Sequence, residues 1–141
     1  MTKEQLASLA KDAMQQAYSP YSDYKVGAAL LCKDGSVYMG CNVENASFSA
    51  TNCAERTAFF KAVSEGKKEF SAIAICGGKD GVIEGLFPPC GVCRQVMREF
   101  CDDDFEIHLL KKDGIETYTL GQLLPVSFQP DTITKDHMEE V

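Results

Sequence analysis

The stretch NCAERTAFFKAVSEGKKEFSAIAIC, residues 52–76, predicts a helix followed by a buried strand. The helix is expected over residues 52–65, with Gly66 as its C-terminal stop, because glycine readily adopts the backbone conformation that ends many helices. Residues 72–76 are a short apolar run of the kind that lies inside a sheet. A helix and a buried strand in succession favour an α/β fold.

Further helices and strands are predicted on both sides of this unit. Before it, a helix and a hairpin of two strands are expected at residues 2–17, 26–32 and 37–41, with a capping box at the helix start and an Asp-Gly turn in the hairpin. After it come a loop, a helix, a strand and a short edge strand, at residues 77–89, 90–100, 105–110 and 116–119. This order predicts an α/β fold of three layers, a mixed β-sheet sandwiched between helices.

The composition is that of one soluble domain, expected over residues 1–141. Hydrophobic residues make up 45% and charged residues 25%, and no apolar run approaches the roughly 20 residues of a membrane span. The polar N-terminus MTKEQLASLA does not read as a secretory signal, so we expect a cytoplasmic protein with no membrane partner. A net charge of -7 opposes binding to nucleic acid, because that affinity depends on Lys and Arg contacts to phosphates.

Seven cysteines, an odd number without an export signal, favour free thiols or metal ligands over a disulfide framework. Taken alone, Cys90-x-x-Cys93 fits a redox dithiol, half of a structural zinc site or two buried thiols. Cys53, however, opens one predicted helix while the pair opens another, and helix N-termini stabilise thiolates. Three thiolates can therefore converge on one zinc. The remaining cysteines are assigned to packing, and His108 and His137 have no evident metal partner.

Glu55 has two interpretations. Structural zinc normally takes four protein ligands, whereas a hydrolytic site leaves one position open, so three cysteines beside a glutamate suit catalysis. Asn52-x-x-Glu55 is also a plausible capping box, in which Glu55 would serve only the helix. Its neighbours Cys53, Cys90 and Cys93 favour the catalytic interpretation.

Three motifs resemble the cytidine deaminase family in order and spacing: Asn42-Val43-Glu44-Asn45, Asn52-Cys53-Ala54-Glu55-Arg56-Thr57-Ala58 and Pro89-Cys90-Gly91-Val92-Cys93-Arg94-Gln95. The resemblance covers nearly the whole chain. It implies the fold of that family and hydrolytic deamination of cytidine and deoxycytidine in pyrimidine salvage. It also implies one Zn²⁺ per subunit on Cys53, Cys90 and Cys93, with Glu55 carrying the protons.

The resemblance assigns further roles around the site. Asn42 and Glu44 bind the ribose 3′-hydroxyl, the Ala54 backbone contacts the base, and Tyr24 and Phe128 lie near the base. Three thiolates and Zn²⁺ total -1, and Arg56, one helical turn after Cys53, supplies a compensating positive charge. The resemblance also implies a homotetramer in which Phe128 completes a neighbouring subunit's pocket. A core position for Phe128 within its own subunit is an equally good interpretation.

Three other functions have to be weighed. A relative acting on a nucleoside-like antibiotic is disfavoured by the sugar-binding pair Asn42 and Glu44, and one acting on polynucleotide cytosine by the acidic charge. A noncatalytic zinc module would need Glu55 only as a cap. A Cys-x-x-Cys oxidoreductase would need a reversible disulfide between Cys90 and Cys93 and would leave Cys53 unexplained.

Overall fold

The computed structural model describes residues 1–133 and contains a mixed sheet of five strands. Their spatial order is β2 (Val37–Cys41), β1 (Tyr24–Cys32), β3 (Phe70–Lys79), β4 (Glu106–Lys111) and β5 (Gly114–Thr119). β3 and β4 run parallel, and the other three neighbouring pairs are antiparallel. A parallel pair of strands needs a long crossover connection. Here the segment that contains the helix at residues 91–100 connects β3 to β4.

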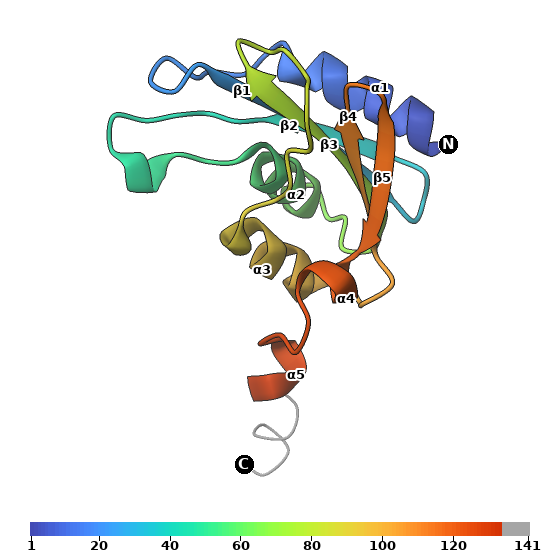
Figure 1. Ribbon diagram of the computed structural model, residues 1–141. Coiled ribbons are helices and arrows are strands. Elements are labelled where there is room, and N and C mark those ends of the chain that lie inside the picture. The colour runs from blue at the N-terminus through green and yellow to red at the C-terminus, as the bar shows by residue number, and fades with distance from the viewer. Residues whose placement is uncertain (134–141) are drawn as a thin grey trace.

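Helices cover both faces of this sheet, as Figure 1 shows. α1 (Lys3–Met14) packs on the side chains that β1 and β3 turn to one face: Ala29, Ala72, Ala74 and Cys76. The alternate residues face α2 (Ala54–Ser64) and α3 (Gly91–Phe100), and form the larger core: Ala28, Leu30, Ile73 and Ile75 with Ala58, Phe59 and Met97. This alternation follows from the two-residue period of a strand. The three-layer prediction is confirmed.

Two glycines bring helices unusually close to the sheet. A Cβ atom at Gly27 would lie 2.0 Å from the carbonyl oxygen of Ala10 in α1, and one at Gly40 would lie 2.5 Å from that of Ala54 in α2. Neither position has room for a side chain. Gly40 therefore fixes the distance between β2 and the first turn of α2, which carries Cys53 and Glu55.

Several predicted boundaries were wrong. The first helix ends at Met14 and not at residue 17, because residues 15–17 turn through bonds such as Gln16 N–H to the Ala13 carbonyl (3.0 Å). β3 continues to Lys79 into the predicted loop, since Gly77 and Gly78 pair with β1 despite their low strand preference.

Three short helical segments were not predicted: η1 (Phe48–Ala50), α4 (Leu120–Leu123) and α5 (Pro130–Ile133). Each is a single turn, too short for a periodic pattern to reveal it. His137 lies outside the described residues. Among residues 1–133, no helix reaches the length and apolar character that crossing a membrane requires.

Candidate active site

Three cysteines meet where the N-termini of α2 and α3 converge. Cys53 is the N-cap of α2, Cys90 is the N-cap of α3, and Cys93 lies in the first turn of α3. Their Sγ atoms all lie within 4.8 Å of one another, with 3.9 Å between Cys53 and Cys90 and 3.5 Å between Cys90 and Cys93. The positive ends of two helix dipoles thus face one sulfur cluster and favour its thiolate form.

The charges around the sulfurs fit a bound cation. The Arg56 Nη2 atom donates a hydrogen bond to the Cys53 Sγ atom at 3.2 Å, and the Arg56 Nε atom is buried without a partner in the described structure. Hydrogen bonding with Cys93, and then with Arg56, lowers the pKa of Cys53 to about 5. The same bond to Cys53, followed by burial, raises the pKa of Cys93. Three sulfur ligands of this kind suit Zn²⁺ and leave a fourth tetrahedral position open.

Glu55 lies directly beside this cluster and is 4% exposed. Burial, the largest cause, raises the pKa of its carboxyl group to about 7, since a charged carboxylate is poorly solvated there. The capping interpretation finds no support: the N-cap of α2 is Cys53, which makes no side-chain cap bond, and the Asn52 amide donates instead to the Thr57 Oγ1 atom at 3.1 Å. A buried carboxyl group without a capping role suits proton transfer.

A pocket of about 220 Å³, which we call the base pocket, reaches the cluster from one side. Its lining comes from β1, the segment after β2, the start of α2 and the connection between β3 and α3, and includes Tyr24, Asn42, Glu44, Cys53, Ala54, Glu55, Phe87 and Cys90. The volume is below the roughly 300 Å³ at which pockets for drug-sized ligands begin. It therefore suits a small ligand held next to the sulfurs.

Asn42 and Glu44 line the base pocket, and the side chains of both form hydrogen bonds with backbone groups. The Asn42 side chain donates to the Tyr24 carbonyl (2.8 Å) and accepts from the Val26 N–H (2.9 Å). The Glu44 Oε1 atom accepts from the N–H groups of Tyr21 and Ser22, at 3.0 and 3.1 Å, and the Ser22 hydroxyl donates to Oε2. These bonds orient two polar groups toward the pocket before any ligand arrives.

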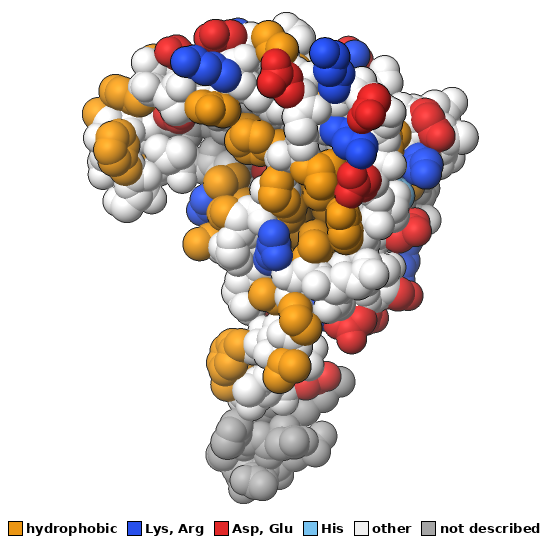
Figure 2. All heavy atoms as spheres, viewed as in Figure 1, with side chains coloured by type: hydrophobic (Ala, Val, Ile, Leu, Met, Phe, Trp, Pro, Cys, Tyr) orange, Lys and Arg blue, Asp and Glu red, His pale blue; other side chains and the backbone are white. Residues whose placement is uncertain are grey.

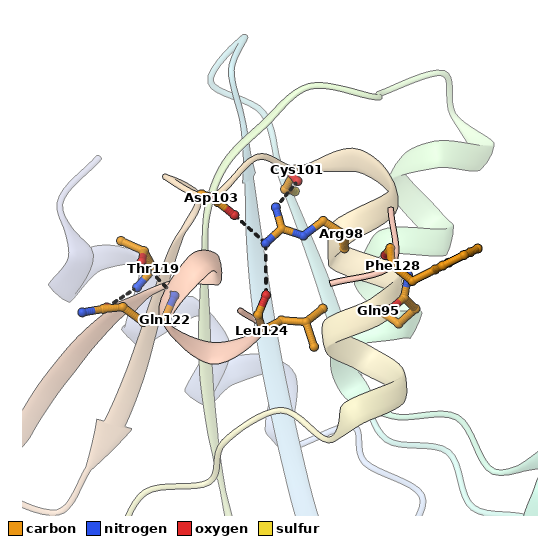
Figure 3. A network of polar contacts seen from close by, with 8 residues as sticks. All are labelled: Gln95, Arg98, Cys101, Asp103, Thr119, Gln122, Leu124 and Phe128. Atoms are coloured by element: carbon orange, nitrogen blue, oxygen red, sulfur yellow. Dashed lines mark hydrogen bonds and ion pairs between the residues drawn. The ribbon is translucent and has the colours of Figure 1, made fainter. Parts of the chain in front are cut away.

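Two of the predicted site residues lie outside the base pocket. Arg56 sits behind Cys53 and touches its sulfur. Phe128 is 58% exposed, and its carbonyl accepts a 2.8 Å hydrogen bond from the Gln95 side chain. Figure 3 shows the Phe128 ring pointing away from α3. Within one described chain, Phe128 is therefore neither a core residue nor part of its own pocket.

Sequence reasoning missed residues that shape the site. Phe87 lines the base pocket, but its only signal was its place before Pro88 in the predicted loop. Arg94, directly after Cys93 in the third motif, donates to the carbonyls of Pro89 and Leu123, at 2.8 and 2.7 Å. These bonds tie the residue before Cys90 to α4.

A buried guanidinium fixes the chain that follows α3. Arg98 is 4% exposed and donates to the Asp103 Oδ1 atom at 2.6 Å and to the carbonyls of Leu124 and Cys101, as Figure 3 shows. One member of the acidic run at residues 102–104, Asp103, therefore forms an ion pair with a buried charge.

The other cysteines and the described histidine stay apart from the sulfur cluster. Cys32, Cys76 and Cys101 are buried, and Cys41 is half-buried in the edge strand β2. His108 is 6% exposed on β4 and shares a 2.8 Å hydrogen bond with the Thr117 hydroxyl. Among residues 1–133, only Cys53, Cys90 and Cys93 form a group able to hold a metal ion.

Comparison with known proteins points to one family. Residues 1–109 match the family described as the cytidine and deoxycytidylate deaminase zinc-binding region. The chain is 47% identical over 135 residues to a cytidine deaminase of Sporosarcina psychrophila, covering 95% of this chain and 96% of the relative. It is 49% identical over 129 residues to one of Halalkalibacterium halodurans, covering 91% and 95%.

A solved structure agrees with the sequence relatives. The crystal structure of a cytidine deaminase from Burkholderia pseudomallei superposes with a TM-score of 0.84 at 46% identity, covering 91% of this chain and all of that one.

Proposed function

This chain belongs to the cytidine deaminase family of zinc-dependent enzymes, and we propose how its residues divide the work of the reaction. The enzyme hydrolyses the bond between C4 of cytidine and its amino group, giving uridine and ammonia. We extend the same reaction to deoxycytidine. The observation that carries the proposal is the buried Glu55 next to a three-sulfur cluster at the end of a small pocket.

Cys53, Cys90 and Cys93 are the zinc ligands. When bound, the zinc supplies Lewis acidity that lowers the pKa of a water molecule toward about 7. Glu55 accepts the two protons of the attacking water in turn and delivers one to ring N3 and the other to the departing amine. One carboxyl group can do both because N3 and the amino group are neighbours on C4. Its raised pKa, about 7, lets it take up and release a proton near neutral pH.

Arg56 reduces the negative charge on the sulfur ligands and does not contact the substrate. Its guanidinium donates to the Cys53 Sγ atom, which withdraws negative charge from the cluster. Three thiolates would otherwise leave the metal site with a net charge of -1 and weaken its Lewis acidity. Arg56 is therefore a positioning and charge-compensating residue.

The polar pair in the pocket lining, Asn42 and Glu44, recognises the sugar. Asn42 and Glu44 would bind the ribose 3′-hydroxyl, while Tyr24 and the Ala54 backbone lie along the base. Because Asn42 and Glu44 are held by backbone bonds, they offer fixed partners to that hydroxyl. A ligand lacking the hydroxyl would leave polar groups unpaired.

We expect kcat/KM for 3′-deoxycytidine to fall at least about tenfold below that for cytidine, and free cytosine to be poorer still. Changing the substrate is the cleaner test, because replacing Asn42 would also break its bonds to β1. Steady-state kinetics with the three compounds checks the prediction. Equal efficiency with cytosine and cytidine would remove the sugar-binding role.

Assembly as a homotetramer would complete the pocket. Large apolar side chains are exposed near its mouth and at the described C-terminus, including Tyr21, Phe48, Val92 and Phe128. In Figure 2 the visible face is hollowed beside the arm that carries η1. Exposed apolar surface of this kind favours subunit contacts. In such an assembly Phe128 would enter the base pocket of a neighbouring subunit.

Mixed oligomers test this arrangement. Glu55→Gln subunits and Phe128→Ala subunits, each inactive alone, should regain a measurable fraction of wild-type turnover when co-assembled, because one site can then combine an intact Glu55 with an intact Phe128. Ammonia release after mixing, with the oligomers verified by native mass spectrometry, measures the rescue. Verified mixed oligomers that stay inactive would rule out action of Phe128 in a neighbouring subunit.

The cellular setting follows from the chemistry. Seven free cysteines fit a reducing compartment, which supports a cytoplasmic location. Converting cytidine to uridine with release of ammonia is a step of pyrimidine salvage, and we propose that role for the enzyme.

A further inference from the structure

A second pocket, of about 430 Å³, lies against the base pocket. Its lining includes Gly78, Lys79, Val82 and Glu84, from the end of β3 and the connection to α3. Two residues, Tyr24 and Phe87, line both pockets. These two aromatic side chains therefore form the partition between a small reaction pocket and a larger space beside it.

The partition is held in place by its neighbours. The rings of Tyr24 and Phe87 lie 6.1 Å apart with 36° between their planes. A Cβ atom at Gly77 would lie 3.0 Å from the Phe87 Cγ atom and 3.1 Å from the Lys25 carbonyl oxygen. Glycine at position 77 thus leaves the room that the Phe87 ring occupies.

The backbone around Phe87 is fastened to the rest of the fold. The Asp80 N–H donates to the Asp23 carbonyl and the Lys112 N–H donates to the Glu84 carbonyl, both at 2.7 Å. Figure 1 shows this connection crossing in front of the sheet before it reaches α3, and hydrophobic side chains gather on the same part of the face in Figure 2. These two bonds anchor the segment that leads to Phe87, and the Phe87 ring itself packs closely on Gly77 of β3.

The proposed function places one edge of the base against this partition. C4 must lie at the sulfur cluster, between the N-termini of α2 and α3, and its two ring neighbours are N3 and C5. N3 faces Glu55, on α2. We place C5, on the other side of C4 from N3, against Phe87 and Pro88, which the connection before Cys90 contributes to the lining of the same pocket.

We propose that Phe87 is a specificity-determining residue that limits the size of a substituent on C5 of the pyrimidine. Hydrogen or another small group fits against the ring. A longer group would have to cross the partition into the second pocket. The substrate class excluded by Phe87 is thus cytidines with extended C5 substituents, and shortening residue 87 would admit them. This inference rests on the proposed deaminase function.

The test compares wild type, Phe87→Val and Phe87→Ala on cytidine and 5-propynylcytidine, whose substituent is linear and rigid. The kcat/KM ratio of 5-propynylcytidine to cytidine should rise at least about tenfold in Phe87→Ala, with Phe87→Val between it and wild type, since pocket walls discriminate by about 10- to 200-fold. Comparing the ratio between enzymes cancels the intrinsic reactivity of each substrate.

Val82→Ala is the matched control, because Val82 is exposed and lines the second pocket only. Its ratio should stay at the wild-type value. The inference is overturned if either Phe87 variant folds and deaminates cytidine yet keeps the wild-type ratio, or if Val82→Ala raises the ratio equally. Turnover of cytidine by the wild-type enzyme tests the proposed function separately. If the wild-type enzyme does not deaminate cytidine, the proposed function is refuted. If it does and the ratios stay unchanged in the Phe87 variants, only the role of Phe87 is refuted.

Discussion

Glu55→Gln is expected to keep one zinc per subunit and to lose at least about two orders of magnitude in kcat, the usual contribution of a general acid and base. The side chain keeps its size and remains buried, but an amide can neither accept the proton of the attacking water nor deliver one to N3. Metal analysis and turnover of the same preparation separate binding from chemistry.

Glu65→Gln gives a matched control, with the same chemical change at the exposed end of the same helix. It should retain wild-type zinc content and turnover. If Glu55→Gln also turned over cytidine at close to the wild-type rate, Glu55 would not carry the protons, and the mechanism would need another group.

Replacing Cys53 or Cys93 by alanine should reduce bound zinc from one per subunit to near zero and abolish turnover. Two sulfurs cannot supply the three protein ligands that a catalytic zinc site uses. Cys41→Ala is the control, because Cys41 is half-buried in β2 and lies outside the cluster. Full zinc occupancy with normal activity in Cys53→Ala would overturn the ligand assignment.

Arg56→Gln should give a different result from the cysteine variants. It removes the charge that compensates the thiolates but leaves all three sulfurs, so zinc should remain while kcat falls by about 10- to 100-fold, the range for partners of metal ligands. A rate equal to wild type in the zinc-loaded variant would show that the guanidinium does not tune the site.

The three-layer architecture could be predicted because its helices and strands are marked by local sequence patterns, and the members of the sulfur cluster because their motifs resemble those of a known family. Cys53 and the Cys90-x-x-Cys93 pair each open a helix, and helix N-termini are marked by short-range capping and loop signals. The convergence of those two N-termini needs the whole sheet, yet the resemblance of the motifs already implied it.

Other features could not be predicted because they depend on contacts between distant segments. The Asn42 side chain bonds to the backbone of β1, 16 to 18 positions earlier, and no spacing rule marks this. Gly77 and Gly78 signalled a loop, but the ladder with β1 draws them into β3. Phe128 lies outside the pocket of its own chain. A role in a neighbouring subunit depends on contacts between chains, which no pattern within one sequence marks.

Ammonia release from zinc-loaded protein is the most direct test of zinc-dependent deamination of a free nucleoside. Cytidine, deoxycytidine, CMP and single-stranded DNA are supplied in parallel, with the uracil product measured alongside ammonia. We expect cytidine and deoxycytidine each to yield one ammonia for every molecule of uracil product. We expect poor activity on the DNA, because the protein is acidic. Folded, zinc-loaded protein that releases no ammonia from cytidine, or that prefers the DNA, would contradict deamination of a free nucleoside by this enzyme.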